Sequence, residues 1–173
     1  MLEAVISLDY SIEAILENLY NPGPFSFFLF ITKLGGTAVI VLVSAYIVYC
    51  LWRKKDKEPA KRFVAFFLLN ELSVFFIKWF INRPRPFAAS ILGEVDGSFP
   101  SGHAASIFVY GFLIYYIPKT KFKRKKIIRL SLGVLVVLIG VSRLYLNVHY
   151  FSDVIFGYLV GLTFLTFLLR SKK

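Results

Sequence analysis

Long apolar stretches alternate with short charged segments along most of the 173-residue chain. Four stretches are clear, and a fifth follows near the C-terminus. They cover approximately residues 36–52, 63–81, 104–117, 127–141 and 154–169. Several are shorter than the roughly 20 residues that a membrane-spanning helix needs, but their apolar flanks extend them. The first can begin earlier, because residues 24–34 are apolar apart from Lys33. This pattern predicts an all-α fold, a polytopic membrane bundle of about five transmembrane helices.

Residues 1–23 follow a different pattern. Apolar side chains recur on one helical face, and acidic side chains recur every four residues on another. The apolar set is Leu8, Ile12, Ile15, Leu16 and Leu19, and the acidic set is Asp9, Glu13 and Glu17. The segment lacks Lys and Arg, unlike a signal peptide. We expect an amphipathic interfacial helix whose apolar face lies on the membrane or on the bundle. With the bundle over 24–170, it forms a single membrane-embedded domain over 1–173.

The basic residues are distributed as a membrane topology predicts. The net charge is +11, and 16 of the 21 Lys and Arg residues lie at alternate ends of the predicted helices, chiefly in 53–62 and 119–126. The positive-inside rule places these ends and the C-terminus in the cytoplasm. No folded basic face suggests nucleic-acid binding. The expected partner is therefore the lipid bilayer.

Five basic residues remain: Lys33, Lys78, Arg83, Arg85 and Arg143. Four of them fall in or beside short motifs on the external side, where the topology rule predicts few cations. An anionic ligand would explain these charges. One cysteine and two histidines are too few for a usual zinc site, and we expect no metal and no cofactor.

Three motifs carry the candidate chemistry. They are Lys78-x6-Arg85-Pro86, Pro100-Ser101-Gly102-His103 and Ser142-Arg143-x5-His149-x3-Asp153. In this order, they resemble the signature of the type-2 phosphatidic acid phosphatase family, which includes bacterial membrane lipid phosphatases and soluble vanadium haloperoxidases. The resemblance extends from about the first span to the C-terminus. It implies a metal-independent hydrolase of phosphoric esters or anhydrides.

The same residues suit a phosphate group on physical grounds. Phosphoryl transfer needs positive charge and hydrogen-bond donors that are fixed in advance. Lys78, Arg85 and Arg143 would supply the charge. Ser101 and Gly102 open the third helix, where backbone N–H groups can approach an anion. These five are the predicted phosphate-binding residues.

The two histidines are the predicted reacting groups. His149 and Asp153 are four residues apart and share one face if the last helix has begun. Asp153 would then accept a proton from one ring nitrogen and leave the other free to attack phosphorus. The resemblance implies that His149 forms a phosphohistidine and that His103 protonates the leaving oxygen. His149, His103 and Asp153 are therefore the predicted catalytic residues.

Other polar residues near the motifs have more than one interpretation. Glu71, inside the second span, would orient Lys78 or pair with another helix. Arg83 lies between motif positions and would contact lipid headgroups. Ser142 would pack or form a structural hydrogen bond. Asn147, Tyr145 and Tyr150 would line the pocket, or the tyrosines would anchor the chain at the membrane interface.

These features and the resemblance favour an integral membrane lipid phosphatase in the inner (cytoplasmic) membrane of a bacterium. Its expected partner is a membrane lipid substrate, and its site is expected on the periplasmic side. The compact chain resembles lipid A 1-phosphatases, so lipid A 1-phosphate or undecaprenyl pyrophosphate is the favoured substrate, with phosphatidylglycerophosphate as the alternative. A haloperoxidase using vanadate is disfavoured by the membrane spans. A non-enzymatic anionic-lipid transporter would have no need of the histidines or Asp153.

Overall fold

The computed structural model describes residues 2–86, 89, 92–116 and 124–170, and all regular elements within them are helices. The helices are α1 (Leu2–Asn18), α2 (Phe25–Leu34), α3 (Thr37–Trp52), α4 (Glu58–Ile81), α6 (Gly102–Ser106), α7 (Phe108–Tyr116), α8 (Arg124–Tyr145) and α9 (Phe151–Arg170). The predicted all-α class is confirmed.

Within the described residues, four segments are long and apolar enough to cross a membrane: Phe25–Trp52, Glu58–Ile81, Lys126–Tyr145 and Phe151–Arg170. The first joins α2 and α3, so this span begins earlier than residue 36, as the apolar flank allowed. The predicted third span is instead a shorter apolar helical stretch, Gly102–Leu113, and its predicted end at residue 117 lies outside the described residues. This stretch packs against α3, α4, α8 and α9, and Ala104, Ile107 and Phe112 are fully buried. Neighbouring helices cover it, so it does not need the length of a lipid-facing span.

The outer surface of the bundle is apolar, as expected for contact with lipid. Leu42, Trp79 and Phe80 expose 70%, 73% and 84% of their areas. The interior is apolar too, and Phe63, Phe66 and Phe112 pack together in its core. The protein is therefore an integral membrane protein.

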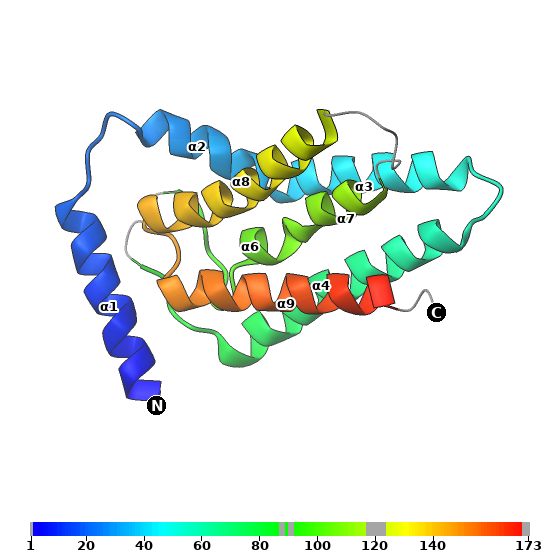
Figure 1. Ribbon diagram of the computed structural model, residues 1–173. Coiled ribbons are helices and arrows are strands. Elements are labelled where there is room, and N and C mark those ends of the chain that lie inside the picture. The colour runs from blue at the N-terminus through cyan, green and yellow to red at the C-terminus, as the bar shows by residue number, and fades with distance from the viewer. Residues whose placement is uncertain (1, 87–88, 90–91, 117–123, 171–173) are drawn as a thin grey trace.

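The two ends of the bundle differ in chemistry (Figure 1). The α3–α4 connection, which begins with Arg53, lies at the same end as the C-terminus of α9. The α4–α6 and α8–α9 connections, which carry motif residues, lie at the opposite end, and α1 lies across that end. The basic α3–α4 connection and the motifs are thus at opposite ends of the bundle, as their sequence pattern predicts.

Close packing of α6 on α9 fixes two motifs relative to each other. A Cβ atom added to Gly157 would lie 2.5 Å from the Ser101 carbonyl oxygen and 2.9 Å from the Ala104 Cβ. One turn later, Gly161 packs equally closely on the Ala105 carbonyl. Small residues four apart allow such backbone contact in membrane helices. The Ser101 N–H also donates to the Asp153 carbonyl oxygen at 2.9 Å, so the second motif is held against the third.

Replacing Gly157 with alanine should destabilise the protein, because the added methyl group would meet backbone that is itself hydrogen-bonded. Overpacking of this kind costs about 1–3 kcal/mol. Gly133→Ala is the matched control, since a Cβ there meets nothing within 4 Å. Thermal unfolding in detergent should show a lower midpoint for G157A and an equal or higher one for G133A. Equal midpoints for the two variants would contradict the packing argument.

Candidate active site

The three motifs meet at the end of the bundle that α1 covers. Five of the predicted site residues line one cavity of about 140 Å³: Lys78, Arg85, Gly102, His103 and His149. Lys78 lies in the last turn of α4, Gly102 and His103 begin α6, and His149 lies just before α9. The structure therefore brings together residues separated by up to 71 positions.

Arg85 determines the hydrogen-bonding state of His149. Its Nη1 lies 3.1 Å from the His149 Nε2 and also donates to the Val148 carbonyl oxygen at 2.9 Å. A guanidinium group only donates, so Nε2 must be the acceptor, and the proton of the neutral ring belongs on Nδ1. This places the lone pair of His149 on the nitrogen that lies beside Arg85.

Asp153 lies next to the other ring nitrogen. Its Oδ2 is 3.4 Å from the His149 Nδ1, but Nδ1 forms no hydrogen bond within the described residues. Instead, Oδ2 accepts the Tyr150 N–H at 2.9 Å. The expected proximity is present, whereas the expected hydrogen bond is not made in this structure. Burial, together with the positive charges of Arg143 and Arg85, holds the pKa of His149 well below its usual value, so the ring is neutral near pH 7.

Ser101 and Arg143 lie around the cavity rather than in its wall. Ser101 is fully buried and its Oγ accepts the Ala104 N–H at 3.4 Å, so its side chain caps α6. Arg143 is also buried; it donates from Nη1 to the Thr32 Oγ1 at 2.9 Å and from Nη2 to Glu94. It lines an adjoining cavity that also contains His103 and Glu94.

Two carboxylates that we did not predict for the site lie among its cations. Both belong to the acidic loop (residues 92–98), which carries Glu94 and Asp96. The Asp96 Oδ2 is 3.0 Å from the Lys78 Nζ, and the Glu94 Oε2 is 3.2 Å from the Arg85 Nη2. Asp96 also pairs with Arg85, and Glu94 with Arg143. The only sequence signal for this pairing is the position of two acids in the external loop between the first two motifs.

These ion pairs decide the charge of both acids. Partial burial alone would raise the pKa of each, but the cations outweigh it and hold the pKa of Glu94 and of Asp96 below the usual range. Both are therefore ionised at neutral pH. An incoming anion must compete with them for Lys78, Arg85 and Arg143.

Arg83 has a different role from the one that we predicted. It does not reach out to lipid headgroups: its Nη1 donates to the Asp153 Oδ1 at 2.7 Å, and its Nη2 donates to the Asp9 Oδ2 at 2.8 Å. Its guanidinium also lies 4.1 Å from the centre of the Tyr150 ring. Two buried carboxylates from distant parts of the chain need a shared cation, and Arg83 supplies it.

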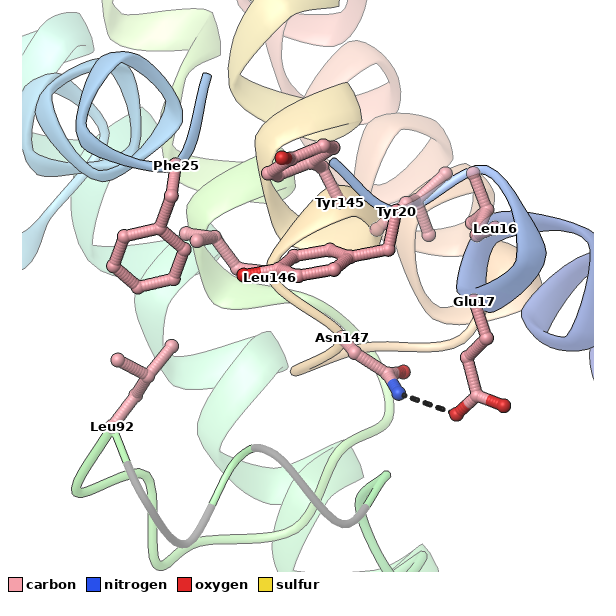
Figure 2. A pocket seen from close by; sticks show the side chains of 9 residues that line it. Leu16, Glu17, Tyr20, Phe25, Leu92, Tyr145, Leu146 and Asn147 are labelled. Atoms are coloured by element: carbon pink, nitrogen blue, oxygen red, sulfur yellow. Dashed lines mark hydrogen bonds between the residues drawn. The ribbon is translucent and has the colours of Figure 1, made fainter. Parts of the chain in front are cut away.

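The acidic face of α1 makes its polar contacts with the bundle. Asp9 is 1% exposed and accepts the Ser152 N–H at 2.8 Å, besides its pair with Arg83. On the same face, Glu17 accepts from the Asn147 Nδ2 at 3.2 Å (Figure 2). The predicted apolar set is divided: Leu8, Ile15 and Leu19 are exposed, whereas Ile12 and Leu16 are half-buried, and Leu16 lines the pocket between α1 and α8. The apolar face therefore lies partly on the bundle.

The remaining predictions concern residues around the site. Glu71 accepts from the Ser106 Oγ at 2.6 Å, so it pairs with another helix, and Lys78 instead donates to the Gly97 carbonyl. Ser142 donates to the Ile139 carbonyl at 2.6 Å, which confirms a structural hydrogen bond. Tyr145 and Asn147 line a separate pocket between α1 and α8, as Figure 2 shows.

The fold and this arrangement define a membrane-embedded helical bundle with a cationic cluster beside two histidines. Residues 59–173 match the PAP2 superfamily, and the chain belongs to that superfamily. Phosphatidylglycerophosphatase B from Bacillus subtilis (strain 168) is 40% identical over 100 residues, which are 55% of this chain. The match spans about half of that relative, 47% of its length.

Two solved structures have the same fold. The crystal structure of the first transmembrane PAP2 type phosphatidylglycerolphosphate phosphatase from Bacillus subtilis superposes with a TM-score of 0.83 at 28% identity, covering 98% of this chain and 88% of that one. Aquifex aeolicus LpxE gives a TM-score of 0.71 at 26% identity, covering 94% and 95%. The predicted membership of a bacterial membrane phosphatase family is confirmed.

Replacing Asp9 with asparagine should loosen α1, because the ion pair with Arg83 is lost while the shape of the side chain is kept. Loss of a charged hydrogen bond at such a partly buried site costs about 1–3 kcal/mol. Hydrogen exchange over Leu2–Asn18 should accelerate in D9N. Glu3→Gln removes the same charge from an exposed position of the same helix and should leave exchange unchanged. Slow exchange in both variants would show that α1 is held by other contacts.

Replacing Asp96 with asparagine should strengthen anion binding, because Lys78 and Arg85 lose a competing carboxylate. Asp96 is half exposed, so a gain of about fivefold in affinity for orthovanadate is expected. Inhibition or calorimetric titration measures this affinity. Glu58→Gln, which removes an acid from the other end of α4, is the control and should have no effect. Weaker binding by D96N would mean that Asp96 positions the two cations instead.

Proposed function

We propose that this protein is a membrane lipid phosphatase that hydrolyses the terminal phosphate of phosphatidylglycerophosphate. The observation that carries the proposal is the position of the His149 Nε2, which lies unprotonated beside Arg85 in a cavity that Lys78 and His103 also line. Cations bind the phosphoryl group, and a neutral imidazole nitrogen is a competent nucleophile.

The proposed reaction has two steps. The His149 Nε2 attacks phosphorus, a P–N bond forms, and the P–O bond to the lipid breaks while His103 gives a proton to the departing oxygen. Water then attacks the phosphohistidine and releases inorganic phosphate. Asp153 stabilises the charge that develops on His149, and Arg143 reaches the phosphate once Glu94 releases it.

The substrate proposal follows the relatives. The sequence-based preference for lipid A 1-phosphate or undecaprenyl pyrophosphate has less support than its alternative. A curated relative and a solved structure with a TM-score of 0.83 are both named as phosphatases of phosphatidylglycerophosphate. LpxE superposes less closely, with a TM-score of 0.71. We therefore place phosphatidylglycerophosphate first and keep the other two lipids as comparisons in the test.

The orientation is proposed from charge. The basic α3–α4 connection and the C-terminus face the cytoplasm under the positive-inside rule, which leaves the cavity on the periplasmic side. The terminal phosphate would then be removed outside the cytoplasm while the acyl chains stay in the bilayer.

Phosphate release from each of the three lipids, measured with purified protein in detergent, tests the substrate proposal. Phosphatidylglycerophosphate should give the highest kcat/KM. A tenfold or larger preference for either other lipid would overturn this choice without changing the reaction type. Binding of all three lipids with no phosphate release from any of them would favour the transporter instead.

Replacing His149 with alanine should abolish phosphate release, because no other group replaces Nε2 as the nucleophile. His103→Ala should lower kcat by about 10²–10⁴, the usual contribution of a general acid. Reactions with labelled substrate that are quenched in alkali, where the P–N bond survives, should contain phosphohistidine in wild-type protein and none in H149A. Unchanged phosphate release by H149A would disprove the assignment of His149 as the nucleophile. Thermal unfolding of each variant shows whether it is still folded.

A further inference from the structure

A second cavity adjoins the phosphate cavity and has a distinct character. Its volume is about 440 Å³, and it shares Thr37, Glu94 and His103 with the phosphate cavity. Its wall is partly apolar, with Leu29, Val39 and Leu92. Lys33, Thr37 and Ala38 also line it and are exposed, so it has an open side at the junction of α2 and α3, within a membrane span.

The cavity is cationic beyond what the three motifs supply. Lys33 lines it and forms no ion pair among the described residues. A lysine within an apolar span is costly unless it serves a ligand or reaches the interface. Arg143 lines the same cavity, is 3% exposed, and leaves its Nε without a hydrogen-bond partner in the described part of the chain.

The backbone adds donors at the same place. α3 begins at Thr37, and no side chain caps its Gly36 N-cap. The first hydrogen bond of this helix joins the Ile40 N–H to the Gly36 carbonyl. The amides of residues 37–39 therefore have no partner within the helix. All three residues line the cavity. A Cβ on Gly35 would lie 3.4 Å from the His103 ring, so this helix start lies against the site.

We propose that this cavity is a subsite for a second phosphate of the substrate, the phosphodiester that joins the headgroup to diacylglycerol. Lys33 binds that phosphodiester, supported by the start of α3, and the terminal phosphate lies between Lys78, Arg85 and His149, with Arg143 between the two phosphates. The acyl chains leave through the open side past Leu29 and Val39. Lys33 thus selects lipids with two phosphates separated by a short linker. This inference rests on the proposed function.

The test compares two lipids in Lys33→Met and wild-type protein. Phosphatidylglycerophosphate carries both phosphates, whereas phosphatidic acid carries only the terminal one. A charged hydrogen bond corresponds to at least about a tenfold change in affinity. K33M should therefore raise the KM for phosphatidylglycerophosphate about tenfold with little change in kcat, and lower its kcat/KM relative to phosphatidic acid by the same factor.

Further variants define the cause. Lys33→Arg should keep most of the preference, and Lys33→Gln should lose it as K33M does. Lys55→Met removes a lysine from the opposite end of the bundle and should leave KM and kcat for both lipids unchanged. Equal losses on both lipids in K33M, or no loss on either, would overturn the subsite.

The reaction product gives an independent measurement. Phosphatidylglycerol retains only the phosphodiester, so its inhibition constant against any hydrolysed lipid phosphate should rise about tenfold in K33M. An unchanged constant would also overturn the subsite. If wild-type protein fails to hydrolyse phosphatidylglycerophosphate, the proposed function fails, and inhibition by phosphatidylglycerol still decides whether Lys33 binds a phosphodiester.

Discussion

The repulsion among three cations in one small region governs the structure of this site. Lys78, Arg85 and Arg143 belong to different segments, and each would be costly in an apolar bundle without an anion. In this structure the anions are Glu94 and Asp96 of the acidic loop. The loop is therefore held over the site by the same charges that would bind phosphate. Protein carboxylates and substrate phosphate are alternative partners of one cationic cluster.

Backbone packing, rather than ionic contact, sets the distance between the second and third motifs. Gly157 and Gly161 let α6 approach α9 closely, and the Ser101 N–H bonds the Asp153 carbonyl. The first turn of α6 is thereby fixed beside the start of α9. Repulsion at the site cannot separate these two motifs unless it also breaks this packing.

The sequence predicts the helical class, the motif residues and the end of the bundle where they meet, because hydrophobic length and local spacing encode them. It does not predict partners across long separations. Asp9 and Arg83 are 74 positions apart, and no local pattern links them. The acidic face of α1 docks because Arg83 and the Ser152 N–H need a buried acceptor, and both are distant in sequence. The burial of the third apolar stretch by neighbouring helices likewise depends on tertiary packing.

His149 connects these constraints to the chemistry. Arg85 donates to its Nε2, so the proposed nucleophile is held by a residue that would also bind the phosphate. A guanidinium binds phosphate oxygens more strongly than it binds a neutral imidazole, because in the bond to phosphate both the donor and the acceptor are charged. In the proposed reaction, the Arg85 guanidinium therefore leaves Nε2 and Asp96 and binds the substrate phosphate instead. The lone pair of His149 becomes free only when phosphorus is next to it. On the other side of the ring, Asp153 is already held by Arg83, which Asp9 holds in turn, so the imidazolium that forms meets a carboxylate fixed in advance.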